Sequence, residues 1–312
     1  MKQYLVYDLG GTFIKFALMN EKGEILEQDK VPSPTDDLDK LLDAMGDIAK
    51  RFEGRFEAAA VSMPGRIDTK KGFAYTGGAY TSIIHNIPFA SLIEEKIGTK
   101  VVVANDGKCA AKAEAAFGAL KDYAHACVIV LGTGTGGGII LNHDVWMGRS
   151  GGAGELSGLI CDLRNYVKKG FSFDDFSSIY AGYGSATGLI MLYAQKKGIP
   201  PMEAFQTING VTFFEAYDAG EPEAIETLKE FGLNAASGIM SVQCVLDLEC
   251  YAIGGGISAR KEVTESIQAG IDKLFENEAI LPFSKPDIVS CQFRNDANLI
   301  GALGFYLDQK NN

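Results

Sequence analysis

The stretch that most constrains the fold is a β-branched run that leads directly into a helix-forming segment. Residues 101–103 are all valine, and an alanine-rich segment follows Asn105 and Asp106. An open α/β sheet binds its ligands at the ends of strands that lead into helices. A single aspartate at such a junction most often caps the helix, but here Asn105 can take the cap while Asp106 faces the ligand. The sequence therefore predicts an α/β fold with a candidate catalytic carboxylate at Asp106.

The N-terminal part of the chain begins with short strands and then adds helical crossovers. Its first two strands are joined by a tight glycine turn, unlike a dinucleotide fingerprint or a P-loop, whose glycines lead into a helix. For this hairpin alone, the alternative is that the glycines only satisfy a positive φ. The predicted strands are 4–8, 13–19, 24–31 and 58–62, the predicted helices are 37–52 and 88–97, the predicted loops are 63–68, 76–79 and 85–86, and a strand and helix fill 101–114.

The pattern of the N-terminal hairpin returns in the middle of the chain. A strand at 126–131, a glycine turn at 132–138 and a strand at 139–142 repeat its order, and 312 residues exceed the size at which one core keeps growing. We therefore expect a small lobe at 1–118, a large lobe at 119–296, and a C-terminal helix within 297–312 that packs back on the small lobe. Further predictions are helices at 173–180, 187–197, 201–207, 212–217 and 222–246, a helix ending at 274, strands at 251–253 and 287–290, and a last helix at 297–306.

Composition excludes several classes of function. The formal net charge of -11 argues against a nucleic-acid or anionic-membrane surface, since both require clustered Lys and Arg. The N-terminus has no signal-peptide pattern and no apolar run has the length of a membrane span, so we expect a cytoplasmic protein. The six cysteines are scattered without a Cys-x-x-Cys pair, which predicts reduced, packed thiols.

Three glycine clusters stand at the ends of predicted strands, at 10–11, 132–138 and 254–256. Backbone amides without side chains allow phosphate oxygens and a flat base to approach closely, so three such clusters together predict a nucleotide-binding protein.

The first of these clusters also carries polar side chains. Asp8, Gly10, Gly11 and Thr12 place a carboxylate, two amides and a hydroxyl in one turn, which suits Mg²⁺ and phosphate oxygens. Lys15 either adds a positive charge to this site or is a solvent-facing strand residue.

The order of these motifs resembles that of the ROK family, which groups bacterial sugar kinases with sugar-responsive repressors. The resemblance covers nearly the whole chain, and the ordered set is specific although each short motif is not. It implies a two-lobed actin/hexokinase-like (ribonuclease H-like) fold, in which each lobe is a mixed sheet flanked by helices, and ATP and Mg²⁺ bound between lobes that close on a hexose. The matching segments are 8–12, 63–68, 105–106, 131–138, 152–155 and 254–256.

The resemblance also implies roles for individual residues. Asp106 corresponds to the catalytic base and Asn105 to a neighbour that hydrogen-bonds the sugar. Gly65 lies on the loop that lines the sugar pocket, and Glu155 corresponds to a carboxylate that accepts bonds from sugar hydroxyls. The nucleotide-binding residues correspond to Asp8, Gly10, Gly11 and Thr12 in the small-lobe phosphate turn, Gly132, Thr133 and Gly134 in its large-lobe counterpart, and Gly254, Gly255 and Gly256 at the adenosine. Phosphoryl transfer needs such positioning, charge neutralisation and one carboxylate to accept the hydroxyl proton.

The chain departs from the family pattern after Glu155. Many family members have Gly-His there, followed by a cysteine cluster that binds structural zinc, whereas this chain has Ser157-Gly158 and only Cys161 nearby. We therefore expect no zinc site. A further sugar-binding Glu of the family has only an approximate match, Asp174 or Asp175, which leaves the identity of the sugar open.

The leading interpretation is an ATP-dependent kinase that phosphorylates a hexose, β-glucoside or N-acylhexosamine at its primary 6-hydroxyl. The alternative is a sugar-responsive regulator, but ROK repressors carry an N-terminal helix-turn-helix, whereas here a strand begins by Tyr4. A non-catalytic sensor is expected to lose Asp106 or the Asp8 turn, and both are intact. The family habit implies a homodimer that binds a small-molecule sugar and ATP.

Overall fold

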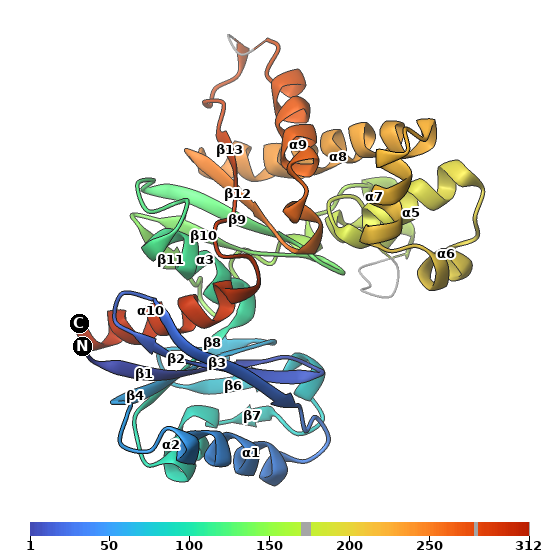
Figure 1. The fold of residues 1–312 in the computed structure, drawn as a ribbon. Coiled ribbons are helices and arrows are strands. Elements are labelled where there is room, and N and C mark those ends of the chain that lie inside the picture. The colour runs from blue at the N-terminus through green and yellow to red at the C-terminus, as the bar shows by residue number, and fades with distance from the viewer. Residues whose placement is uncertain (170–175, 278–279, 312) are drawn as a thin grey trace. The chain divides into compact units, whose positions relative to one another are not determined.

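The computed structural model describes residues 1–169, 176–277 and 280–311, and the chain divides into two compact units. Unit 1 comprises 1–122, 138–153 and 295–312, and unit 2 comprises 123–137 and 154–294. Two five-stranded sheets flanked by helices dominate the structure (Figure 1), as the α/β interpretation predicted.

The first sheet begins as an antiparallel meander and continues with parallel strands. β1 pairs antiparallel with β2, and β2 with β3, whereas β4 is parallel to both β1 and β8. Because β1, β4 and β8 run in the same direction, their carboxyl ends meet at one edge of the sheet. The strands are β1 (Gln3–Leu9), β2 (Phe13–Asn20), β3 (Ile25–Pro32), β4 (Ala58–Met63) and β8 (Val101–Asn105), in the order β3-β2-β1-β4-β8.

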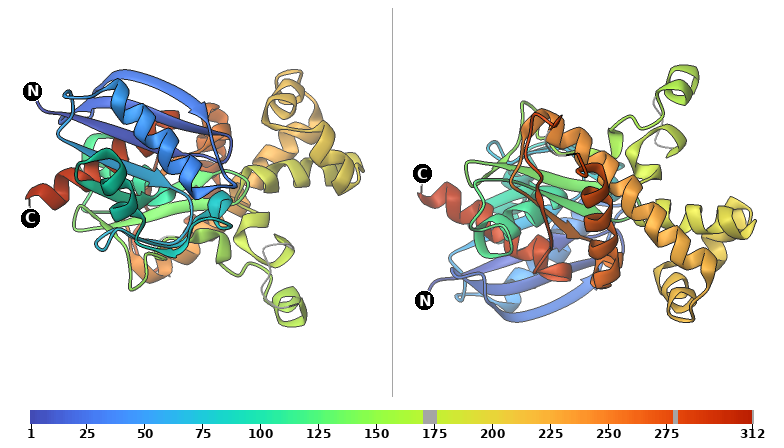
Figure 2. Two further views of the ribbon diagram at one scale, coloured as in Figure 1. Left: turned by 90° about the horizontal axis from the view of Figure 1, so that it is seen from below. Right: turned by 90° about the horizontal axis from the view of Figure 1, so that it is seen from above.

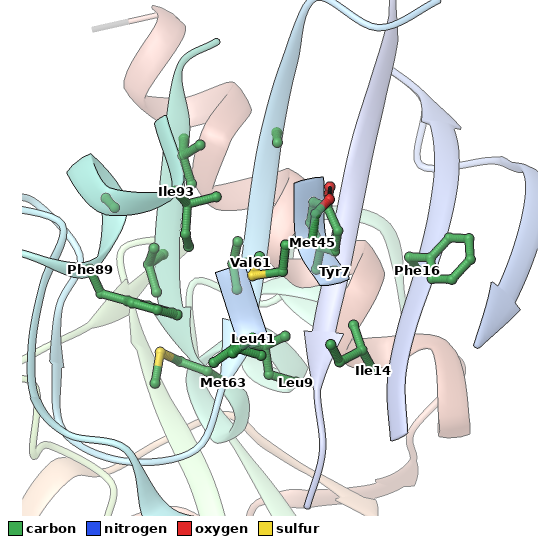
Figure 3. Packing of buried hydrophobic residues seen from close by; sticks show 14 of the residues in the cluster. Tyr7, Leu9, Ile14, Phe16, Leu41, Met45, Val61, Met63, Phe89 and Ile93 are labelled. Carbon is green, nitrogen blue, oxygen red and sulfur yellow. Dashed lines mark hydrogen bonds between the residues drawn. The ribbon is translucent and has the colours of Figure 1, made fainter. Parts of the chain in front are cut away.

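Helices cover both faces of this sheet (Figure 1). On one face, α1 (Leu38–Arg51) and α2 (Phe89–Ile97) close a hydrophobic core that includes Tyr7 and Leu9 (Figure 3). The other face packs against α10 (Ala297–Asn311), which also contacts α3 (Asp106–Phe117). Side chains alternate along a strand, so Asp8 points away from the core of Tyr7 and Leu9 and toward the α10 face.

The second sheet has the strand order β11-β10-β9-β12-β13, with β12 parallel to both β9 and β13. The long helices α8 (Pro222–Leu246) and α9 (Lys261–Leu274) pack side by side in unit 2 (Figure 2). The strands are β9 (His125–Leu131), β10 (Thr135–Leu141), β11 (Asp144–Trp146), β12 (Cys250–Gly254) and β13 (Asp287–Ser290), and the shorter helices are α4 (Leu163–Lys169), α5 (Ala186–Lys197), α6 (Pro201–Thr207) and α7 (Gly210–Asp218).

The expected loops around Gly65 were wrong in part. They contain a small antiparallel sheet of β5 (Ile67–Asp68), β6 (Phe73–Thr76) and β7 (His85–Ile87). Strands this short show too few residues for an alternating pattern to be visible, so only their pairing identifies them. Pro88 was expected in the first turn of α2. It is instead the N-cap residue, and the helix begins at Phe89.

Three expectations for unit 2 also need correction. The second glycine turn ends at Gly134, because Thr135 already belongs to β10. Residues 176–178 and 180–182 form two short 3-10 turns instead of the predicted helix, whose residues 173–175 lie outside the described ranges, and α4 was not predicted. Cys161 and Cys244 are exposed, so not every thiol is packed.

No helix within the described ranges is both long enough and apolar enough to cross a membrane.

Candidate active site

The polar residues predicted from the sequence gather at the carboxyl-terminal edge of the first sheet. The phosphate turn, defined here as residues 10–12, follows β1, the sugar loop, defined as residues 64–68, follows β4, and Asp106 follows β8. The three strands are parallel neighbours, so their ends lie side by side. This edge of unit 1 is where an open α/β sheet binds ligands.

Asp106 is held in place by its neighbour Asn105. The Asn105 side chain accepts a hydrogen bond from Lys108 N at 3.1 Å and so caps α3. Its Nδ2 donates to Asp106 Oδ1 and to Gly65 O, both at 2.9 Å. Asn105 therefore takes the cap, as the adjacent pair of polar residues suggested, and it also joins Asp106 to the sugar loop. Both of its amide protons serve these bonds, which leaves the amide oxygen as the atom with acceptor capacity for a sugar hydroxyl.

Gly65 occupies a backbone position that only glycine tolerates. Its φ of +105° lies outside the range of L side chains, and a Cβ placed there would lie 2.3 Å from Thr76 O. Arg66 N donates to Thr76 Oγ1 at 2.9 Å, which keeps the sugar loop against β6. The sugar loop is thus attached to β6 at Arg66.

The phosphate turn closes through a bond from Gly10 N to Phe13 O of 3.0 Å. Neither Gly10 nor Gly11 has a positive φ, which excludes the hypothesis that these glycines only relieve backbone strain. A Cβ at Gly11 would lie 3.3 Å from the Ala79 Cβ, so the turn is tightly packed on one side, and its residues Gly11 and Thr12 are exposed. Exposed amides and a hydroxyl in a tight turn suit phosphate oxygens.

Asp8 lies directly before this turn and is only 8% exposed. Burial raises the pKa of its carboxyl, and three neighbours counter that effect: a hydrogen bond from Asn298, the charge of Lys15, and Ser62. Asn298 Nδ2 donates to Asp8 Oδ1 at 3.1 Å from the first turn of α10. Sequence reasoning missed Asn298, because nothing in a local pattern connects two residues 290 positions apart.

Lys15 is paired with Asp8 across β1 and β2 and is partly buried. The structure therefore favours the view that it adds a charge to this edge.

The donor set at this turn fits Mg²⁺. The Asp8 carboxylate and the Thr12 hydroxyl are hard oxygen ligands, and Mg²⁺ is usually held by one or two carboxylates together with substrate phosphates. In the described part of the chain, no group of three or more His, Cys, Asp and Glu side chains could hold a metal without such help.

Two further glycine clusters lie at one edge of the second sheet, at the ends of strands that belong to unit 2. The turn at 132–134 follows β9 and the cluster at 254–256 ends β12, which is parallel to β9. Gly255 has a φ of +96°, and a Cβ there would lie 2.3 Å from Leu131 O. The close approach of the two turns explains why that position requires glycine.

The Ser157 side chain stabilises the turn at 132–134 through hydrogen bonds to the residue that follows it. Thr135 N donates to its hydroxyl at 2.8 Å, and the hydroxyl lies 3.3 Å from Thr135 O, to which it donates. Glu155 is exposed two residues earlier, at the start of a 3-10 turn. Ser157 and Gly158 stand where the zinc-binding relatives have Gly-His. Hydrogen bonds thus join this segment to Thr135, the residue directly after the 132–134 turn. Asp174 and Asp175 lie outside the described residues.

Strand, glycine turn and strand recur in two mixed sheets, and a carboxylate begins a helix at the glycine-turn edge of the first. This combination defines the hexokinase-like class of α/β proteins. The chain belongs to the ROK family, whose model matches residues 4–309.

Several of the named relatives are sugar kinases. An N-acetyl-D-glucosamine kinase of Vibrio atlanticus (strain LGP32) is 28% identical over 291 residues, which are 89% of this chain and 92% of that protein. A beta-glucoside kinase of Klebsiella pneumoniae is 29% identical over 255 residues, 81% and 82% of the two chains. The crystal structure of a ROK family glucokinase from Streptomyces griseus in complex with glucose and AMPPNP matches with a TM-score of 0.76 and 25% identity, over 96% of this chain and 98% of that one. These findings confirm the predicted fold and family.

Proposed function

We propose that this chain is an ATP-dependent carbohydrate kinase that transfers the γ-phosphoryl group to the 6-hydroxyl of a hexose, a β-glucoside or an N-acylhexosamine. The observation that carries the proposal is the position of Asp106. Asn105 and Gly107 hold its carboxylate through bonds of 2.9 and 2.8 Å, at the sheet edge that also carries the phosphate turn. The named kinases among the relatives support the same activity.

In this mechanism each residue of the edge has a distinct task. Asp106 accepts the proton of the attacking hydroxyl, and Asn105 and Gly107 keep its oxygen in place. Asp8 would hold Mg²⁺ through water or phosphate, and the amide of Gly11 would receive phosphate oxygens together with the Thr12 hydroxyl and the charge of Lys15. Gly10, whose N–H is bonded to Phe13 O, shapes the turn that presents them. When bound, Mg²⁺ would supply neutralisation of the phosphate charge.

The remaining proposed contacts rest on the resemblance to the family. Glu155 accepts hydrogen bonds from sugar hydroxyls, as does the Asn105 amide oxygen, and Gly65 shapes the sugar loop. The nucleotide is received by the turn of Gly132, Thr133 and Gly134 and, at the adenosine, by Gly254, Gly255 and Gly256. Neither the amide turns nor the sugar residues need to move a proton, so the chemistry rests on Asp106 alone.

The segment at Ser157 and Gly158 supports tolerance of a substituent at C1 or C2 of the sugar. In the zinc-bearing relatives a histidine of this segment offers a ring and a donor, whereas Gly158 offers neither. The Ser157 hydroxyl is engaged with Thr135 and has no second proton to give. A site without a specific polar partner discriminates weakly against analogues. N-acetylated hexosamines and β-glucosides are therefore the favoured substrates.

A coupled ADP-release assay with four sugars tests the proposal. Glucose, N-acetyl-D-glucosamine, N-acetylmannosamine and cellobiose are compared by kcat/KM under one set of conditions, with Asp106→Asn as the inactive control. We expect at least one substituted sugar to match or exceed glucose. A preference for glucose above about a hundredfold over the other three would overturn the tolerant pocket. Sugar binding without any ADP release would favour a sensor or regulator instead.

Three further expectations remain proposals. They are the division into a small lobe of 1–118 with the helix of 297–312 and a large lobe of 119–296, assembly as a homodimer, and a cytoplasmic location. Sedimentation analysis of the purified chain tests the second.

A further inference from the structure

A tyrosine outside the phosphate turn holds this turn through a hydrogen bond, and the sequence analysis did not single it out. Tyr80 lies in the 3-10 turn Gly78–Tyr80, its side chain is fully buried, and its hydroxyl donates to Gly10 O at 2.7 Å. Burial raises the pKa of Tyr80, so the hydroxyl keeps the proton that it donates. This bond fixes the carbonyl of the first glycine of the turn.

Ser33, the residue directly after β3, is bonded both to Tyr80 and to the phosphate turn. Its hydroxyl is hydrogen-bonded to the Tyr80 hydroxyl, and its backbone N donates to Thr12 O at 3.0 Å. Tyr80 has a single proton, which goes to Gly10, so Ser33 is the donor in their shared bond. The phosphate turn is therefore held at both ends, at Gly10 by Tyr80 and at Thr12 by Ser33.

The segment that carries Tyr80 also packs against the sugar loop. Gly78 has a φ of +57°, and a Cβ there would lie 2.6 Å from Pro64 Cβ. Two residues earlier, Thr76 O is so close to Gly65 that a side chain on Gly65 would collide with it. Asn105 in turn donates to Gly65 O and to Asp106. A continuous set of contacts within unit 1 thus joins Asp106, the sugar loop, Tyr80 and the phosphate turn.

We propose that Tyr80 is a positioning residue that couples the sugar loop to the phosphate turn, so that a bound sugar strengthens the binding of nucleotide. The proposal rests on the kinase function proposed above. A sugar that orders the loop at Gly65 orders the segment of Tyr80 with it. The Gly10 carbonyl then keeps the peptide plane that it shares with the Gly11 N–H in the geometry that points this N–H at phosphate. By linkage, nucleotide strengthens sugar binding by the same factor.

The decisive experiment compares Tyr80→Phe with Tyr7→Phe. Both residues are fully buried in the same core, and each hydroxyl donates to a backbone carbonyl, Tyr80 to Gly10 and Tyr7 to Met45 O at 2.9 Å. Figure 3 shows Tyr7 beside Met45 among the apolar side chains of the cluster. The two variants therefore lose the same chemical group and the same kind of donor bond, and Tyr80→Phe also removes the acceptor of the Ser33 hydroxyl. Only one of these bonds ends on the phosphate turn.

Nucleotide affinity is measured by calorimetry with AMPPNP, with and without each of the four sugars, alongside the melting temperature and the KM for Mg·ATP. We expect similar melting temperatures for the two variants. For Tyr80→Phe alone we expect AMPPNP to bind about five- to tenfold more weakly, and the gain in affinity on adding sugar to fall toward one. Ser33→Ala keeps the Tyr80 ring and should show a smaller loss in the same direction, which decides the matter if Tyr80→Phe folds poorly.

Equal nucleotide affinity in Tyr80→Phe and Tyr7→Phe would overturn the inference, because both tyrosines would then be structural only. An unchanged gain from sugar in Tyr80→Phe would overturn the coupling. A wild-type chain that binds AMPPNP but phosphorylates none of the sugars would refute the kinase function, whereas the AMPPNP comparison would still decide the role of Tyr80.

Discussion

Replacing Asp106 with asparagine separates a catalytic carboxylate from a structural one. Two hydrogen bonds end on Asp106 Oδ1, from Asn105 Nδ2 and from Gly107 N. The amide oxygen of an asparagine has the same size and accepts both bonds. Asn105, and not Asp106, caps α3 through Lys108 N. We therefore expect the free energy of unfolding to change by less than about 1 kcal/mol.

Turnover should respond far more than stability. The amide cannot accept the proton of the sugar hydroxyl, so Asp106→Asn should lower kcat by roughly 10²- to 10⁴-fold. That loss corresponds to a rise of about 2.7–5.5 kcal/mol in the activation free energy. The KM for Mg·ATP should stay close to the wild-type value, because the variant keeps the phosphate turn intact.

The assay is coupled ADP release at saturating sugar and Mg·ATP, with thermal unfolding of the same samples. Asp37→Asn is the matched control, since Asp37 caps α1 by accepting from Lys40 N at 3.1 Å. This control removes a charge from the N-cap of a helix to which no site role is assigned, and it should leave kcat unchanged. If Asp106→Asn retained turnover within about threefold of wild type, Asp106 would be a structural residue and another base would have to be found.

Four further outcomes are expected. Gly65→Ala should cost about 1–3 kcal/mol of stability and weaken sugar binding more than nucleotide binding, as separate titrations will show, because its Cβ would meet Thr76 O. Asp8→Asn should abolish use of Mg·ATP yet raise the melting temperature, and the rise should grow with pH. Burial raises the pKa of Asp8, so its contribution to stability is lost as pH rises through that pKa, and an uncharged amide escapes this loss. Ser157→Ala should raise the KM for Mg·ATP about fivefold, since the 132–134 turn loses its bonds through Thr135, and an unchanged KM would mean that the turn holds without them. Elemental analysis should find no stoichiometric zinc, while chelators should still stop turnover by removing Mg²⁺, and about one zinc per chain would contradict the reading of the 157–161 segment.

Local patterns were sufficient for most long elements. The predicted bounds 201–207, 222–246 and 287–290 coincide with α6, α8 and β13. The spacing of their apolar residues indicates which side chains are buried, and a proline marks the start of each of the two helices. The same reasoning failed for β5, β6 and β7, which lie outside the two large sheets and pair with one another. It also extended the second glycine turn too far, because Gly136–138 look like a turn and yet pair as a strand.

For the candidate site too, some features could be predicted from the sequence and others only from the structure. Asp8, Gly10, Gly11, Gly65, Asn105 and Asp106 could be selected from the sequence, because a carboxylate or a glycine at the end of a strand is a local signal with a chemical reason. The sequence also left open whether Asn105 or Asp106 caps the helix. Only the structure decided it, through the distance between Asn105 and Lys108 N.

By itself, therefore, the sequence determined the family and the α/β class and selected the candidate residues for phosphoryl transfer, since these follow from residue type and order. The tertiary structure alone decided which groups hold those residues in place. Asn298 reaches Asp8, and Tyr80 reaches Gly10, across separations of 290 and 70 residues. Such bonds form only after the sheet has brought distant segments to one edge, and neither side chain differs, as a residue type, from many others in the chain. Positioning is a property of the assembled fold, whereas chemical capacity is already present in the amino acids.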